Sequence, residues 1–84
     1  MKPQVITGNK QLGQIVRDRR KLLRISQTAL GEAVGLNQAT ISSLEIGKAR
    51  VRIDTIFRVL SELGLELTIG PKPSPDDANR NSPW

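Results

Sequence analysis

The chain has 84 residues, 37% of them apolar, which suffices for one small domain. It contains no cysteine and no histidine, so disulfides, zinc fingers and catalysis by histidine or cysteine are excluded. The formal net charge of +5 favours an acidic partner such as nucleic acid. No apolar stretch approaches the roughly 18 residues of a membrane span, and Met1-Lys2-Pro3 opens no signal peptide, so a cytoplasmic protein without a membrane partner is expected.

The first half of the chain predicts two helices after an N-terminal extension over residues 1–9. Apolar residues at spacings of three and four predict a helix over 10–23, with Leu12, Ile15, Val16, Leu22 and Leu23 on its apolar face. Ser26 is a good N-cap for a second helix over 27–33, and Gly35 ends that helix. The residues expected to face inward from it are Ala29, Leu30, Ala33 and Val34.

Two further helices are predicted before the pattern changes. Asn37 caps a helix over 38–45 that buries Ile41 and Leu44. Asp54 is predicted to cap a helix over 54–63, which Gly64 ends. Its residues at core spacing are Ile56, Phe57, Val59, Leu60 and Leu63.

Residues 65–69 alternate between apolar and polar side chains, which predicts a short strand. A lone strand leaves its edges unpaired, so it must pair with residues 4–7 or with the same strand of a second chain. A homodimer through Leu65, Leu67 and Ile69 is therefore predicted. Residues 10–70 form the predicted domain, and 71–84, with four of the five prolines, form a flexible tail.

The stretch from Gln27 to Leu44 predicts a helix-turn-helix. Gly35 provides the tight turn, and small residues at Ala29, Gly31 and Ala33 allow close approach. The second helix presents small polar side chains that suit base edges in a DNA major groove. The predicted base-reading residues are Asn37, Gln38, Ala39, Ser42 and Ser43.

A second group of side chains is predicted to contact DNA phosphates: Gln27, Thr28, Thr40, Lys48, Arg50 and Arg52. Each feature has a plainer interpretation. In that interpretation the two helices form an ordinary helical hairpin, the polar residues of the second helix have no ligand, and the charged residues of the loop are only exposed to solvent. Arg20 and Glu45 are interpreted as a structural ion pair between helices.

Residues 10–63 resemble the lambda-repressor-like (Cro and XRE-type) helix-turn-helix family. The matching residues are Arg20, Ser26-Gln27, Leu30-Gly31, Gly35-Leu36, Thr40-Ile41-Ser42 and Glu45-Ile46-Gly47-Lys48. The resemblance implies an all-α bundle of four to five helices, here with one short C-terminal strand that pairs across a dimer. Gly31 departs from the alanine usual in the family, at a cost in helix propensity of up to about 1 kcal/mol.

A narrower resemblance is to HipB-type antitoxins. It rests on Gln38-Ala39-Thr40-Ile41-Ser42, on residues 65–69 directly after the last helix, and on the polar tail that ends in Trp84. It implies strand pairing across a dimer, repression of the protein's own operon and binding to a HipA-type kinase toxin. Trp84 is the expected toxin-binding anchor. The alternative interpretation is that a tryptophan ends the chain by chance.

The sequence thus predicts a sequence-specific repressor that binds double-stranded DNA at a palindromic operator, with no cofactor or metal. The alternatives are a stand-alone repressor without a toxin and a helical adaptor that binds only protein. An enzyme is not expected, because histidine and cysteine are lacking and Asp76-Asp77 lies in the tail.

Overall fold

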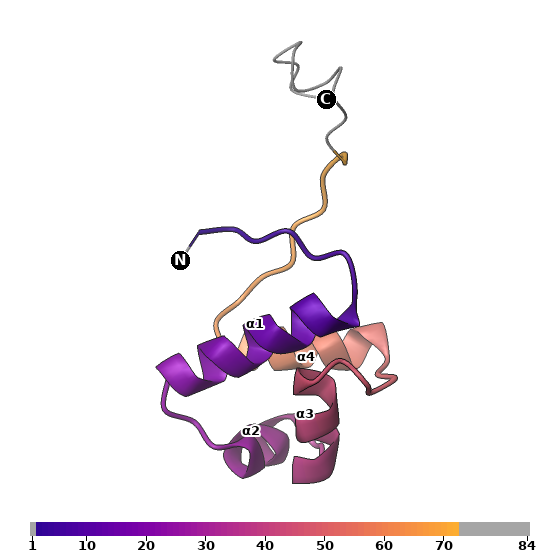
Figure 1. Cartoon of the computed structure of the whole chain (residues 1–84). Coiled ribbons are helices and arrows are strands. Elements are labelled where there is room, and N and C mark those ends of the chain that lie inside the picture. The colour runs from indigo at the N-terminus through magenta and orange to yellow at the C-terminus, as the bar shows by residue number, and fades with distance from the viewer. Residues whose placement is uncertain (1, 73–84) are drawn as a thin grey trace.

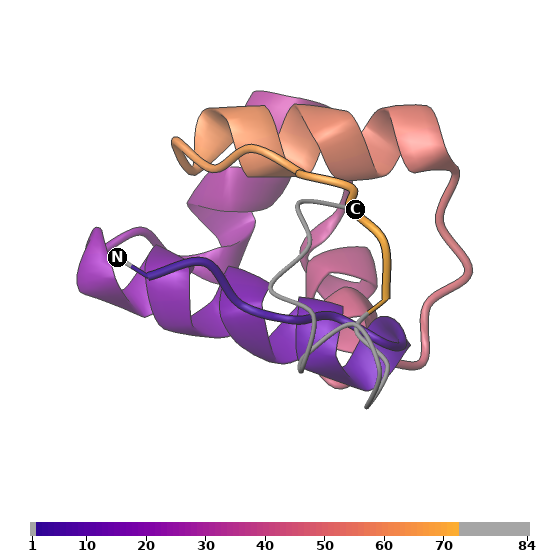
Figure 2. The same ribbon diagram turned by 90° about the horizontal axis from the view of Figure 1, so that it is seen from above.

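The computed structural model describes residues 2–72, and the regular structure within them is four helices. These are α1 (Asn9–Leu22), α2 (Gln27–Val34), α3 (Gln38–Glu45) and α4 (Ile53–Glu62). Figure 1 shows α1 above α2 and α3, with α4 behind it, and Figure 2, seen from above, shows α1 and α4 along opposite sides of the domain. The predicted all-α class is confirmed. Most of the predicted tail, with Trp84, lies outside the described residues.

The ends of α2 and α3 follow from local chemistry. The Ser26 hydroxyl accepts a hydrogen bond of 3.0 Å from the backbone N–H of Ala29, and the Asn37 side chain accepts one of 2.8 Å from that of Thr40. Gly35 ends α2 with φ +78°, a left-handed conformation that glycine adopts without steric cost. The predicted caps of these two helices are therefore confirmed.

The predicted cap of the last helix was wrong. The N-cap of α4 is Arg52, whose side chain makes no capping bond, and Asp54 lies inside the first turn. There its carboxylate accepts hydrogen bonds from the backbone N–H of Thr55 at 2.9 Å and from Arg52 Nε at 3.3 Å. A carboxylate in the first turn still stabilises the positive end of the helix dipole.

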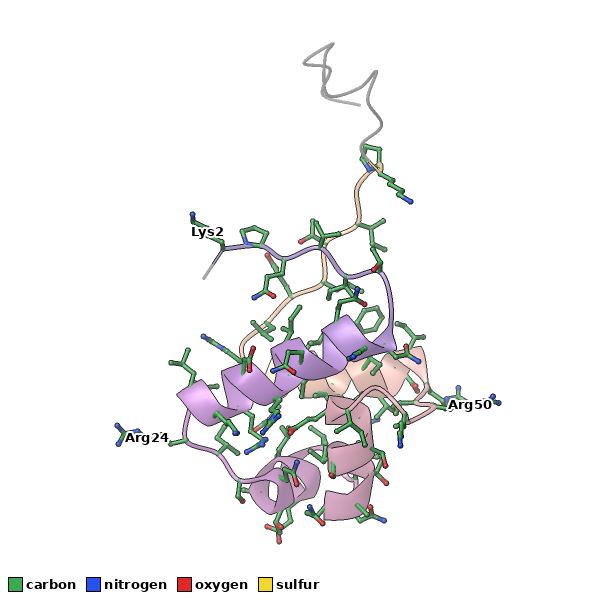
Figure 3. All side chains as sticks on the ribbon, viewed as in Figure 1. Lys2, Arg24 and Arg50 are labelled. Atoms are coloured by element: carbon green, nitrogen blue, oxygen red, sulfur yellow. The ribbon has the colours of Figure 1, made fainter. Side chains whose placement is uncertain are left out.

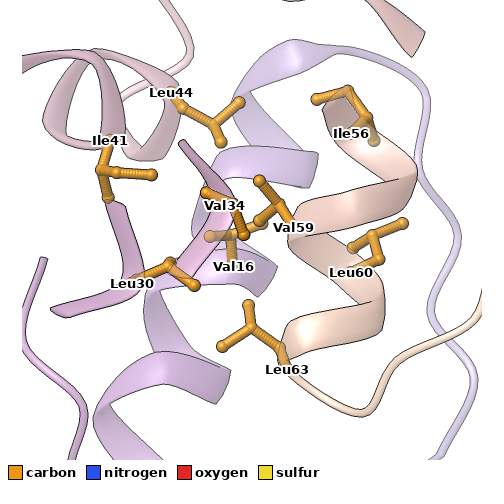
Figure 4. Packing of buried hydrophobic residues seen from close by; sticks show 9 residues of the cluster. All are labelled: Val16, Leu30, Val34, Ile41, Leu44, Ile56, Val59, Leu60 and Leu63. Carbon is orange, nitrogen blue, oxygen red and sulfur yellow. The ribbon is translucent and has the colours of Figure 1, made fainter. Parts of the chain in front are cut away.

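One apolar core joins all four helices. Figure 4 shows its nine residues converging between the helices: Val16, Leu30, Val34, Ile41, Leu44, Ile56, Val59, Leu60 and Leu63. α2, α3 and α4 each contribute residues three or four apart, as expected for one buried stripe per helix, and α1 contributes Val16. This core fixes the angle between α2 and α3.

Several residues predicted to be buried are exposed. Leu22 and Leu23 are 69% and 41% exposed, because the end of α1 projects beyond α3, the helix on which it packs (Figure 1). Phe57 is 50% exposed, because α4 turns Ile56 and Leu60 inward instead. Ala29 and Ala33 are also exposed, because the buried residues of α2 are Leu30, Gly31 and Val34.

Two glycines mark close backbone approaches. A Cβ atom on Gly31 would clash with the backbone carbonyl oxygen of Leu36, in the turn after α2. A Cβ atom on Gly13 would clash with the carbonyl oxygen of Leu44 and lie 2.6 Å from that of Glu45. Gly31 is thus the small residue that the helix-turn-helix needs, whereas Gly13, which the sequence analysis missed, lets α1 pack on the end of α3.

The segments that flank the helices are extended. In the described chain, residues 65–72 form no strand, and no backbone hydrogen bond joins residues 65–69 to 4–7. The pairing within one chain is therefore absent, and pairing across a dimer stays a prediction. None of the described helices has the length and apolarity that crossing a membrane requires.

Candidate nucleic-acid interface

The second helix of the helix-turn-helix, α3, turns one stripe into the core and leaves the rest accessible. Ile41, Leu44 and Glu45 are buried, whereas Gln38 and Ala39 are exposed at the start of the helix. The turn that precedes it is held by a 2.8 Å hydrogen bond from the Leu36 N–H to the Gly31 carbonyl. The short α3 is thus presented on the surface at a fixed angle to α2.

The predicted base-reading residues differ in how available they are. Gln38 and Ala39 are exposed, and Ser42 and Ser43 are half-buried. Asn37 is exposed, but its side-chain oxygen already accepts bonds of 2.8 Å from both the N–H and the hydroxyl of Thr40. Gln38 and Ala39 are therefore the exposed residues of the predicted set whose side chains do not cap the helix.

Four side chains form a hydrogen-bonded network that leads from the interior to the start of α3. Arg20 Nε and Nη2 donate to the two carboxylate oxygens of Glu45, at 2.7 and 3.0 Å. Gln27 Nε2 donates to Glu45 Oε1 at 3.0 Å, and Gln38 Nε2 donates to Gln27 Oε1 at 2.6 Å. We call Arg20, Glu45, Gln27 and Gln38 the four-residue network.

The buried end of this network is the ion pair predicted from the sequence. Arg20 is 8% exposed and Glu45 4%. Arg20 Nη1 also donates to the Ile25 carbonyl at 2.9 Å, so the guanidinium binds the carboxylate and the link between α1 and α2. The hydrogen bonds to Glu45 raise the pKa of Arg20 above its usual value despite the opposing effect of burial, so the guanidinium stays charged.

The predicted phosphate-binding residues lie at two places. Lys48, Arg50 and Arg52 are exposed in the segment between α3 and α4, and Arg50 points away from the domain in Figure 3. The Arg52 side chain forms an exposed ion pair with Asp54, which holds it only weakly. Thr28, Thr40 and Gln27 lie instead at the start of α2 and α3, where backbone N–H groups favour an anion.

The sequence analysis missed the contact between Gln27 and Gln38. These residues are 11 positions apart, and their bond depends on the angle at which α2 and α3 meet. No local pattern reports that angle. The described residues hold no group of three or more acidic side chains suited to a metal ion.

Known proteins have a similar sequence or fold. A helix-turn-helix family model matches residues 16–69, more than half of the chain. The ImmF control region 10 kDa protein of Bacillus phage phi105 is 28% identical over 60 residues, which cover 71% of this chain and 67% of the phage protein.

Solved structures are similar over larger shares. A HipB variant in complex with an O2 20mer is 28% identical, with a TM-score of 0.75 over 86% of this chain and 100% of that chain. A chain of the HipA-HipB-O2-O3 complex is also 28% identical, with a TM-score of 0.74 over 84% of this chain and 100% of that chain. The restriction-modification controller protein C.AhdI from Aeromonas hydrophila is 26% identical, with a TM-score of 0.63 over 68% of this chain and 83% of that chain.

The match to this family over residues 16–69, together with the basic charge and the exposed polar start of α3, identifies a DNA-binding regulator of transcription. The chain belongs to the helix-turn-helix family, and within it to the lambda-repressor-like, XRE-type proteins with HipB-like members.

Proposed function

We propose that the protein is a HipB-type antitoxin, which represses its own operon as a homodimer and binds a HipA-type kinase toxin. The observation that carries the DNA-binding part is the exposed start of α3, where Gln38 is held by Gln27. The toxin part is supported by the likeness to HipB over 100% of its chain, including a chain solved in complex with HipA.

In this proposal α3 enters the major groove of an operator. The Gln38 amide binds an adenine edge through a donor and an acceptor, and Ala39 contacts a thymine methyl. Ser42 and Ser43 bind less selectively, and Asn37 contributes mainly as a cap. Gln27, Thr28, Thr40, Lys48, Arg50 and Arg52 contact phosphates and set the register of the helix on the DNA.

Replacement of Gln38 tests this reading of bases. We expect Gln38→Ala to cost about 1–3 kcal/mol of binding free energy and to relax the preference at one base pair in each half-site. Binding selection from randomised DNA duplexes measures that preference. An unchanged preference at every position would remove Gln38 from base recognition, and Glu32→Ala, on the exposed surface of α2, is the control.

The dimer is proposed to form through Leu65, Leu67 and Ile69, of which Ile69 is 86% exposed in the single chain. Leu67 also lines an open groove of about 670 Å³, together with Ile6, Leu12, Val51, Ile53 and Ile56. A second copy of the chain would cover the apolar part of this groove, which Arg50 and Arg52 also line, and would pair the backbone groups of 66–69. The Leu65 N–H already donates to the Leu60 carbonyl. A palindromic operator then has half-sites about 34 Å apart.

A charge placed in this surface should separate the two copies. We expect Leu67→Lys to give monomers with weak operator binding, because a buried lysine without a partner is strongly unfavourable. The neighbouring Thr68→Lys adds the same single positive charge at an exposed position and should stay dimeric. Sedimentation measures both, and a fully dimeric Leu67→Lys would place the interface elsewhere.

Trp84, which lies outside the described residues, is proposed as a toxin anchor. Its ring can bury about 150–250 Å² in a partner's pocket. We expect Trp84→Ala to weaken calorimetric binding to a HipA-type kinase encoded beside this gene, with unchanged DNA affinity. Equal toxin affinity would reject the anchor, and no binding by the wild type would favour a stand-alone repressor, the function to which the controller protein's likeness points.

A further inference from the structure

The four-residue network has a direction that its chemistry imposes. A guanidinium only donates hydrogen bonds, a carboxylate only accepts them, and a glutamine amide has one end of each kind. Glu45 Oε1 accepts from Arg20 Nη2 and from Gln27 Nε2, both at 3.0 Å. Gln27 must therefore turn its NH₂ group inward to Glu45 and its oxygen outward to Gln38.

The orientation of the Gln27 amide in turn fixes the orientation of the exposed Gln38 amide. Because Gln27 offers only an oxygen, Gln38 donates to it through Nε2, at 2.6 Å. One N–H and the side-chain oxygen of Gln38 are left for a ligand. An adenine edge in the major groove presents one acceptor, N7, and one donor, the N6 amino group, which match this pair.

We propose that Glu45 is a positioning residue for base recognition, whose buried carboxylate orients the Gln38 amide through Gln27 and so sets a preference for adenine over guanine. The inference rests on the proposed reading of bases by Gln38. In the described chain, Gln27 is the side chain that holds the Gln38 amide, so the direction of this bond decides which groups face the DNA.

Glu45→Gln reverses the direction. Arg20 Nε has the shorter bond to Glu45, 2.7 Å to Oε2, so the oxygen of the new amide takes that position. The NH₂ group then lies at the Oε1 position, where it faces Gln27 and also Arg20 Nη2, which loses its acceptor. Gln27 responds by turning its own oxygen inward and its NH₂ group outward, and Gln38 must accept from it. Gln38 would then turn its NH₂ group outward, to the place where adenine carries its N6 amino group and guanine carries the acceptor O6. The adenine amino group loses its partner, and guanine O6 gains one.

The test is a binding selection from randomised duplexes, at a temperature where circular dichroism shows each variant folded. We expect Glu45→Gln to lower the preference for adenine over guanine by about 5- to 150-fold at the Gln38 position, and at no other. A structural role alone would lower stability and weaken all sequences alike.

Arg20→Lys is the matched control, because it breaks the two-pronged ion pair but leaves the carboxylate as an acceptor for Gln27. We expect it to melt earlier and to keep the preference for adenine. Gln27→Met removes the link and leaves both hydrogen bonds between Arg20 and Glu45 in place. It should reduce the preference for adenine over guanine, and it serves as the test if Glu45→Gln does not fold.

The outcomes separate the two hypotheses. If folded Glu45→Gln keeps the preference for adenine, the positioning role of Glu45 is overturned and the proposed function is not. If Glu45→Gln does not fold, an unchanged preference in Gln27→Met has the same meaning. The positioning role would also be overturned if Arg20→Lys lost the preference for adenine as much as Glu45→Gln does. It would be overturned as well if the wild type selected a sequence without adenine at this position. A wild type that selects no sequence would reject the proposed function itself.

Discussion

Gly31 and Gly13 each lie where another segment's backbone leaves no space for a side chain. At most helical positions glycine is unfavourable, because it costs about 1 kcal/mol relative to alanine. At Gly31 the carbonyl of Leu36 occupies the place that a methyl group would take. Helix propensity and packing therefore favour different residues at this position, and a single substitution compares them.

We expect Gly31→Ala to destabilise the protein by up to about 2 kcal/mol, because overpacking costs about 1–3 kcal/mol and the gain in helix propensity offsets about 1 kcal/mol of it. Urea denaturation measures the change. Glu32→Ala, on the exposed face of the same helix, should change stability by less than about 0.5 kcal/mol. A Gly31→Ala protein as stable as the wild type would mean that the turn after α2 yields easily.

Each helix was predicted within about one residue at its ends, since caps and glycines act locally. The errors concern which residues each helix buries. Phe57 has core spacing in the sequence, yet the stripe of α4 that faces the core runs through Ile56, Val59 and Leu60. Burial and the Gln27–Gln38 contact both depend on how the helices are placed relative to one another, which no local pattern encodes.

The cap of α3 separates two roles that were predicted for one residue. We expect Asn37→Ala to lower stability by about 0.5–2 kcal/mol, because the Thr40 N–H loses its partner. Asn37→Ser keeps a capping oxygen and should recover most of the loss. Thermal denaturation follows both variants. A large change in base preference in Asn37→Ser, at full stability, would restore Asn37 to the base-reading set.

Across the whole molecule, exposed cations are found at opposite edges of the domain. Figure 3 shows Arg50 and Arg24 pointing away from the domain at its two ends, Arg50 after α3 and Arg24 after α1. Only the first lies close in sequence to the predicted recognition helix. Because phosphate contacts release counterions, the salt dependence of binding reports which of the two edges meets the DNA.

We expect Arg50→Gln to weaken binding to all duplexes alike and to lower the slope of log K against log salt by about one unit per chain. Arg24→Gln removes the same charge and should leave the slope unchanged. Fluorescence anisotropy at several salt concentrations measures both. Equal slopes for Arg50→Gln and the wild type would show that Arg50 is only a solvated surface charge.

The buried pair of Arg20 and Glu45 also limits how such a protein can evolve. Loss of either partner alone leaves a buried charge, at a cost of about 3–5 kcal/mol, a large share of the 5–15 kcal/mol that stabilises a typical domain. A lineage cannot readily exchange the two residues one at a time. Mutations that retarget such a regulator to a new operator are therefore expected to accumulate at exposed positions of α3, while this pair stays fixed.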